Sequence, residues 1–187
     1  IGAEKPEDYG DYFAWGETTP YDKNLTWVNY FWPHNPCSPD NILSSIYDAA
    51  TVNWGNSWRM PTYEEQKELL EKCKWTWIDN IYNSSTSGYI VTSTVNQKSI
   101  FLPAVKYISH DKYDEVTEKD GWYWSSWNTA PNGKYSLQPT GGAGALKFID
   151  MTIGMVLPAE QIFATMGDGL SVRAVVGTPN DYLPNRD

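Results

Sequence analysis

Few residues of this chain have side chains suited to nucleophilic catalysis. The two histidines, His34 and His110, lie in Trp-Pro-His-Asn-Pro and Ser-His-Asp-Lys, without a serine or cysteine in a nucleophile elbow. The two cysteines, Cys37 and Cys73, can pair or stay free, and their spacing is not that of zinc ligands. The sequence remains compatible with a catalytic triad whose residues are distant in the chain and meet only in the folded protein. We interpret both histidines as loop residues and expect no enzyme and no cofactor.

Carboxylates gather in the segment DKYDEVTEKDG, which spans residues 111–121. A glycosidase needs two carboxylates about 5–10 Å apart across a cleft, and linear spacing does not show such a pair. Asp111, Asp114 and Asp120 have oxygen ligands for calcium, but the glycine and terminal glutamate of an EF-hand are missing. We interpret the segment as a solvated loop of mixed charge. No metal site is predicted, and a calcium requirement stays open.

The composition excludes several classes of protein. The chain has 187 residues and a formal net charge of −9, so an acidic surface repels phosphates and nucleic-acid binding is not expected. No window approaches the roughly 18–20 apolar residues of a membrane-spanning helix. With 41% hydrophobic residues, the chain can bury the core of one domain. We expect a single domain over residues 1–177 and a tail or linker over 178–187.

Tryptophan is unusually frequent, with 10 residues among 187. Trp54 and Trp58 flank a glycine and are expected to pack where two predicted helices meet. Trp75 and Trp77 alternate, and we expect one to face the core and the other the rim. Trp127 follows a predicted strand and begins a long loop, so it is the best candidate for an exposed platform that stacks on a sugar ring. The alternative interpretation of each of these tryptophans is that its side chain packs in the hydrophobic core.

Two helices are predicted in the first half of the chain. Ser38-Pro39-Asp40 is typical of a cap followed by proline, and the first helix should run from there to a stop at Gly55. The second helix should begin at Thr62, because Glu65 three positions later completes a capping box. Leu69, Leu70 and Cys73 form its expected buried stripe.

The second half is predicted to be β-structure with long loops. Short strands are expected over residues 89–93, 99–102, 122–126, 145–150 and 170–176. Loops over 130–144 and 151–169 are too long for simple connections and favour a functional role or disorder. The fold class is therefore α+β, with two helices packed on one side of a short-stranded, twisted antiparallel sheet with long ordered loops.

Five sequence segments carry a resemblance to a known family. They are GAEKPEDYGDYFAWGET, YDAATVNWGNSWRMPTYEE, SIFLPA, YWSS and GLSVRAV, in this order from Gly2 to Val175. Together they resemble the Fibrobacter succinogenes major paralogous domain. That family looks like a C-type-lectin-like fold, related to the formylglycine-generating group and to the variable proteins that retroelements diversify. The resemblance implies a structural role for the shared motifs, with Arg173 as a partly buried partner of a carboxylate or of carbonyls.

The resemblance also implies where a ligand would bind. In the diversified proteins the contacts come from the surface between YWSS and SVR, which here is the segment from Trp127 to Asp168. Aromatic and amide side chains there suit recognition of a protein or glycan surface. The predicted ligand-binding residues are Trp127, Asn128, Asn132, Lys147, Asp150, Thr152, Phe163, Thr165 and Met166.

The expected function is ligand recognition outside the cell. Members of the family are typically secreted or surface-anchored lipoproteins of bacteria or phages, so we expect an extracellular or cell-surface module that binds a protein or a glycan. It should be a monomer or part of a longer multidomain protein. The resemblance implies a further strand before Ile1, so we expect a truncated or processed N-terminus. A structural or tip module of a surface assembly such as a pilus is the alternative. A formylglycine-generating enzyme fits less well, because it needs reactive cysteines late in the chain.

Overall fold

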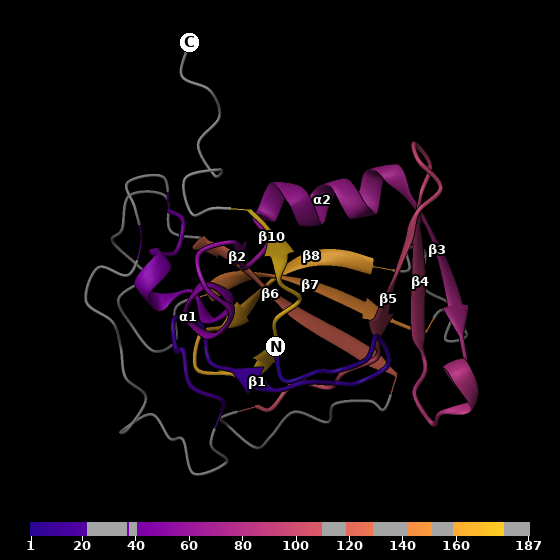
Figure 1. Cartoon of the computed structure of the whole chain (residues 1–187), viewed down its shortest axis with the longest axis horizontal. Helices are drawn as coiled ribbons and strands as arrows, with labels where there is room; N and C mark the ends of the chain where they lie inside the picture. The colour runs from indigo at the N-terminus through magenta and orange to yellow at the C-terminus, as the bar shows by residue number, and fades with distance from the viewer. Residues whose placement is uncertain (22–36, 38–40, 110–118, 129–141, 151–158, 178–187) are drawn as a thin grey trace.

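The chain folds into short helices and strands that alternate with ordered loops (Figure 1). The computed structural model describes residues 1–21, 37, 41–109, 119–128, 142–150 and 159–177. Within these residues the elements are β1 (Tyr12–Phe13), η1 (Ser45–Tyr47), α1 (Ala49–Trp54), β2 (Trp58–Arg59), α2 (Tyr63–Lys72), β3 (Cys73–Ile78), η2 (Ile81–Asn83), β4 (Gly88–Ser93), β5 (Ser99–Pro103), β6 (Asp120–Asn128), β7 (Gly142–Ile149), β8 (Ala159–Thr165), β9 (Leu170–Ser171) and β10 (Val175–Val176). The predicted α+β class is confirmed.

Three sheets are present in the described part of the chain. The largest has the order β1-β9-β6-β7-β8, and β3-β4-β5 and β10-β2 form the two smaller ones. Neighbouring strands are antiparallel, except for the pair β6 and β9. The central strand β6 is buried along most of its length. Because side chains alternate along a strand, Tyr123 and Trp124 point to opposite faces of the large sheet and belong to two different cores.

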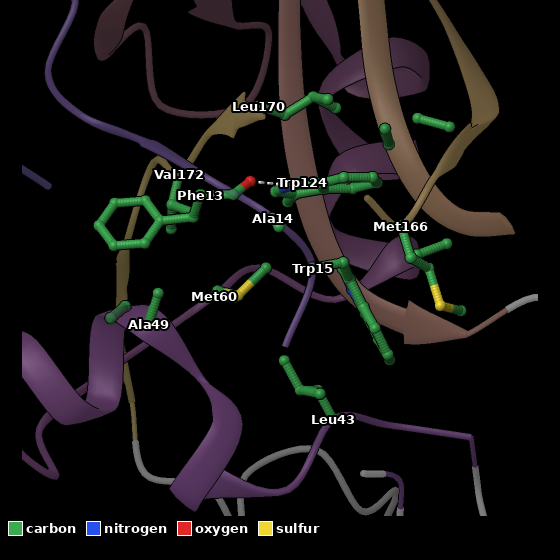
Figure 2. Packing of buried hydrophobic residues seen from close by; sticks show 14 of the residues in the cluster. Phe13, Ala14, Trp15, Leu43, Ala49, Met60, Trp124, Met166, Leu170 and Val172 are labelled. Carbon is green, nitrogen blue, oxygen red and sulfur yellow. Dashed lines mark hydrogen bonds between the residues drawn. The ribbon is translucent and has the colours of Figure 1, made fainter. Parts of the chain in front are cut away.

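One core surrounds Trp124 (Figure 2). Its indole Nε1 donates a hydrogen bond to the carbonyl oxygen of Phe13 at 2.7 Å. Trp15 lies beside it, and the Trp15 indole donates to the carbonyl oxygen of Ser125 at 2.9 Å. Each indole therefore ties the N-terminal segment to β6 through both apolar burial and a satisfied polar group.

The second core lies on the opposite face, between the large sheet and the β3-β4-β5 sheet. Tyr123 and Phe148 of the large sheet contact each other with ring centroids 6.0 Å apart, and Tyr89 of β4 packs on Phe148 at 5.3 Å. Leu69 and Leu70 of α2 pack against this core, whereas Ala49 and Ala50 of α1 belong to the Trp124 core. The prediction that both helices lie on one side of the sheet is therefore wrong.

Capping residues predicted the start of the second helix correctly and the start of the first helix wrongly. The hydroxyl of Thr62 accepts from the Glu65 amide and the Glu65 carboxylate accepts from the Thr62 amide, which confirms the predicted capping box. The first helix is shorter than predicted: it begins at Ala49, with Asp48 as its N-cap, and Gly55 ends it as expected. Residues 42–48 form isolated bridges and a 3-10 turn instead, and the predicted cap at 38–40 lies outside the described residues.

The predictions for two segments of the second half of the chain, and for one residue of the buried face of the second helix, are wrong. Cys73 is the first residue of β3 and not part of the helix stripe. The predicted strand over 170–176 is two short strands in different sheets, since β9 pairs with β1 and β10 with β2. The predicted loop over 151–169 contains the edge strand β8.

The structure tests the predicted places of two pairs of tryptophans. Trp75 and Trp77 lie two residues apart in β3, so they face the same way, and both rings pack on Tyr89 at 5.4 and 5.0 Å. The prediction that one of them faces the core and the other the rim is therefore wrong. Trp54 and Trp58 pack edge to face at 5.1 Å between α1 and β2, which confirms their predicted place.

The start of α2 is strengthened by an ion pair. Arg59 Nη1 and Nη2 donate to the two carboxylate oxygens of Glu65 at 2.7 Å each, and Arg59 itself is buried. Burial raises the pKa of Glu65, but the hydrogen bonds from Arg59 and the Thr62 amide together outweigh it, and the pKa lies below its usual 4.5. A carboxylate with a depressed pKa stabilises the fold above its unfolded pKa and loses this contribution as the pH falls through the folded value.

We therefore expect Glu65→Gln to lower the free energy of unfolding at pH 7 by about 1 kcal/mol, since the side chain is partly exposed and its ion pair is screened. The difference from wild type should shrink as the pH falls from 4.5 through the lower pKa of folded Glu65, because the carboxylate of the folded state is then protonated as well. Urea unfolding at a series of pH values measures this. Glu64→Gln is the matched control, because the Glu64 carboxylate is exposed and lies 4.0 Å from Lys67. Equal losses in the two variants would contradict the role of Glu65.

Candidate functional site

Three aromatic side chains from three distant segments form a continuous group that we call the aromatic surface. It consists of Tyr63, Trp127 and Phe163. The ring centroids of Tyr63 and Trp127 are 4.7 Å apart, and those of Trp127 and Phe163 are 6.0 Å apart. Tyr63 and Trp127 are half-buried, whereas the side chain of Phe163 is 60% exposed. A large exposed aromatic ring next to two others is unusual on a surface that faces only water.

Regular elements hold each of the three rings. Tyr63 is the first residue of α2, and its carbonyl oxygen accepts a 2.6 Å hydrogen bond from the side chain of Gln161 on β8. Trp127 lies in β6 within the stretch from Trp124 to Asn128 where the pairing with β7 shifts register, and it bridges to Ile42. Phe163 lies on β8, opposite Gly144 of β7. The surface is therefore fixed by a helix start and two strands.

Gly144 explains how the rings approach the sheet. A Cβ atom at this position would lie 2.7 Å from the hydroxyl of Ser125 and 3.4 Å from both the Trp127 and the Tyr63 rings. Ser125 in turn donates a 2.8 Å hydrogen bond to the carbonyl oxygen of Gly144. The missing side chain of Gly144 therefore makes room under the aromatic surface.

Only some of the predicted ligand-binding residues lie together. Trp127 and Phe163 are in the aromatic surface, and Thr165 lies two residues after Phe163 on the same face of β8. Lys147 lies on the other face of the large sheet, where its ammonium group is 4.8 Å from the centroid of the Trp122 ring. This cation–π contact occupies the Lys147 side chain away from the aromatic surface.

Three of the predicted ligand-binding residues are buried. Met166 is fully buried in the Trp124 core. Asp150 is buried, and its carboxylate accepts a 2.5 Å hydrogen bond from Lys119. Asn128 is buried as well, and its amide Nδ2 lies 3.5 Å from the sulfur of Cys37. These side chains stabilise the fold and cannot touch a ligand in this conformation, so we leave them out of the site.

Other predictions fall on residues that the structure does not describe. Among the predicted ligand-binding residues these are Asn132 and Thr152. The two histidines, the acidic residues at 111–118 and the tail over 178–187 lie outside the described residues as well.

The two cysteines are both half-buried and are not bonded to each other. Burial raises the pKa of Cys37 and of Cys73 above its usual value near 9. Because the thiolate is the nucleophilic form, both groups are weak nucleophiles at neutral pH.

Arg173 occupies the role that the sequence resemblance implied. Its Nη2 donates to the carbonyl oxygen of Pro6 at 2.7 Å and to that of Phe101 at 3.3 Å. One side chain thus connects the N-terminal segment, the strand β5 and the C-terminal part of the described chain. The prediction of a partly buried partner for carbonyls is confirmed.

Sequence reasoning missed Tyr63, Gly144 and Gln161 as parts of the site. Tyr63 follows the helix cap and Gly144 lies in a glycine-rich run, and neither feature indicates a neighbour far away in the sequence. The segment around Gln161 contained a weak signal, since Ile162 and Phe163 favour strands.

The described residues contain neither a cluster of metal-ligating side chains nor a membrane-spanning helix. No group of three or more His, Cys, Asp or Glu side chains there is arranged to hold a metal ion. None of the helices in this part of the chain has the length and apolar character needed to cross a membrane.

Comparison with known proteins yields no relative: no family model, no curated protein and no solved structure matches the chain.

Proposed function

We propose that this domain is an extracellular or cell-surface recognition module that binds a protein or glycan ligand through its aromatic surface. The observation that carries the proposal is the run of rings from Tyr63 through Trp127 to the exposed Phe163. Exposed aromatic area does not contribute the favourable free energy of burial. A ligand that covers these rings would gain that free energy on binding.

The surface has the physical properties of a good binding platform. Tyrosine and tryptophan offer a large contact area at a low cost in conformational entropy, because each side chain has only two rotatable bonds. The backbone of β6, β7 and β8 holds the rings in place, so little order has to be created on binding. Sugar rings and apolar protein side chains can both stack on such a platform.

We also propose that the scaffold is C-type-lectin-like, as the sequence resemblance implies. The motifs that carry the resemblance meet in space although they are far apart in the chain. Tyr12 of the first motif pairs with Ser171 of the last, and Arg59 of the second pairs with Val175 of the last. Trp124 in turn bonds to the Phe13 carbonyl. Shared motifs with this arrangement support a common structural framework.

The direct test is a screen of the protein against an array of glycans and a set of bacterial and host surface proteins. The ligand found there should bind the double variant Trp127→Ala/Phe163→Ala at least tenfold more weakly, because exposed aromatic anchors dominate such interfaces. Tyr9→Ala is the matched control, since the Tyr9 ring is also exposed but lies outside the aromatic surface. Unchanged binding by the double variant, or an equal loss in the control, would contradict the assignment of this surface.

A further inference from the structure

A cleft of about 1000 Å³ lies beside α2 and contains no residue of the aromatic surface. It is bounded by residues 1–6, by one side of α2, by the hairpin of β4 and β5 and by residues 172–175. Tyr123 and Leu146 from the middle of the large sheet also line it. This volume is that of a site for a small molecule.

The lining of the cleft is mainly apolar. Leu69 projects from α2, while Ile100 and Leu102 project from β5. The side chain of Ile100 is 48% exposed, although it lies next to the buried Leu102 on a strand that faces the cleft. An apolar molecule placed here would cover such exposed area and gain the free energy of its burial.

Two ion pairs lie at the cleft, whereas Glu4, Lys5 and Arg173 line it without belonging to an ion pair of the described residues. The carboxylate of Glu65 pairs with Arg59 and that of Glu68 with Lys72. Arg173 also lines the cleft, and it donates hydrogen bonds to two neutral carbonyl oxygens, those of Pro6 and Phe101. No ion pair among the described residues includes Arg173. Its guanidinium therefore keeps a net positive charge at an apolar cleft, together with donors suited to an oxyanion.

An extended peptide is a poor occupant, even though β5 is the edge of its sheet. A peptide strand would need the outward-facing backbone groups of β5. The carbonyl of Phe101 already accepts from Arg173, and that of Pro103 accepts from the Tyr123 hydroxyl at 2.5 Å. Pro103 has no N–H group to donate. The edge is thus closed to strand addition, which favours a small molecule.

We propose that this cleft binds a small amphipathic anion, with an apolar chain against Leu69, Ile100 and Leu102 and an oxyanion head group at Arg173. A carboxylate and a phosphate head group share this chemistry. Salt screens the charges of the chain that lie more than about 8 Å away. Of the carboxylates that line the cleft, those of Glu65 and Glu68 are paired with Arg59 and Lys72.

Calorimetric titration of the whole chain with dodecanoate, dodecyl phosphate, dodecanol and dodecyltrimethylammonium, each below its micelle concentration, tests the proposal. We expect one equivalent of dodecanoate or dodecyl phosphate to bind at least about tenfold more tightly than dodecanol, and the cation to bind most weakly. The stronger of the two anions identifies the head group. Equal affinities for the anions, the alcohol and the cation would overturn the proposal.

Two variants locate the binding to the cleft. Ile100→Glu places a charge in the apolar wall at a half-exposed position that the fold tolerates, and it should weaken dodecanoate binding more than tenfold. Arg173→Gln should remove the preference for anions over dodecanol, whereas Arg173→Lys should retain part of it. Unchanged binding by Ile100→Glu would overturn the proposal even if the Arg173 variants fail to fold.

The aromatic surface provides the matched control for this experiment. Trp127→Ala should leave dodecanoate binding unchanged, because Trp127 does not line the cleft. Loss of dodecanoate binding in this variant would place the amphiphile on the aromatic surface and reject the cleft. The two proposals can therefore fail separately.

Discussion

Replacing Trp124 with alanine is expected to lower the free energy of unfolding by about 3–5 kcal/mol. The side chain is 0% exposed and lies at the centre of the core that joins β6 to the N-terminal segment (Figure 2). Its removal leaves a cavity and also takes the hydrogen-bond donor from the carbonyl oxygen of Phe13. Equilibrium unfolding in urea, followed by circular dichroism, measures the loss.

Two further variants separate the contributions to this effect. Trp124→Phe keeps most of the apolar contact but leaves the Phe13 carbonyl without its indole donor, so a loss of about 1–3 kcal/mol is expected. Trp127→Ala, three residues further along β6, should cost much less, because that ring is half-buried at the surface. If Trp124→Ala and Trp127→Ala destabilised the protein equally, the assignment of one tryptophan to the core and the other to the surface would be wrong.

Replacing Asp48 with alanine is expected to lower the free energy of unfolding by about 3–5 kcal/mol as well. Asp48 is 1% exposed, and its carboxylate accepts from three backbone amides. Oδ1 accepts from Ala50 at 2.9 Å and from Thr51 at 3.0 Å, and Oδ2 accepts from Met60 at 2.9 Å. The residue thus caps α1 and ties it to the segment that leads into α2.

The variant Asp48→Asn serves as the matched comparison. Its single carbonyl oxygen can still cap Ala50 and Thr51, but its amide group would face the Met60 N–H donor, so about half of the loss is expected. Urea unfolding of both variants at pH 7 provides the comparison. Destabilisation of less than 1 kcal/mol by Asp48→Ala would show that water replaces the carboxylate, and the role of Asp48 as a buried link would be rejected.

The tryptophans show most clearly what tertiary contacts add to composition. Trp15 and Trp124 fix loop-like segments in one core, and Trp75 and Trp77 pack together on Tyr89. Trp127 is the tryptophan that joins the aromatic surface. The sequence predicted it as an exposed platform after a strand, but it lies within β6 and is half-buried. Its two neighbours, Tyr63 and Phe163, are 64 and 36 residues away in the chain, and no local pattern could bring them together.

The elements that were predicted correctly are those specified by neighbouring residues. The capping box at Thr62 and Glu65 and the following charged face define α2 within ten residues. The strands β4 and β5 also follow from a local pattern, because their residue types favour strands and a turn separates them. The edge strand β8 was missed because its burial does not alternate regularly: one side of it carries the exposed Phe163.

The predicted start of the first helix was wrong because contacts between distant parts of the chain decide it. The apolar residues over 42–50 have a helix-like spacing, but Ile42 and Leu43 bridge to Trp127 and Cys37 instead. The Asp48 carboxylate then begins α1 later, since it bonds to Met60 as well as to the helix amides. Long-range hydrogen bonds outweighed local propensity here, and nothing within the segment could reveal them.

The sequence by itself therefore determined the α+β class, the second helix, most of the strands of the second half and the structural use of most tryptophans, because these features depend on residues close together in the chain. Only the tertiary structure decided which predicted ligand residues share a surface: it buried Met166, Asp150 and Asn128 and turned Lys147 to the opposite face. The reason is physical. Burial and the face of a strand depend on register between distant segments, and one residue of register moves a side chain from the surface to the core.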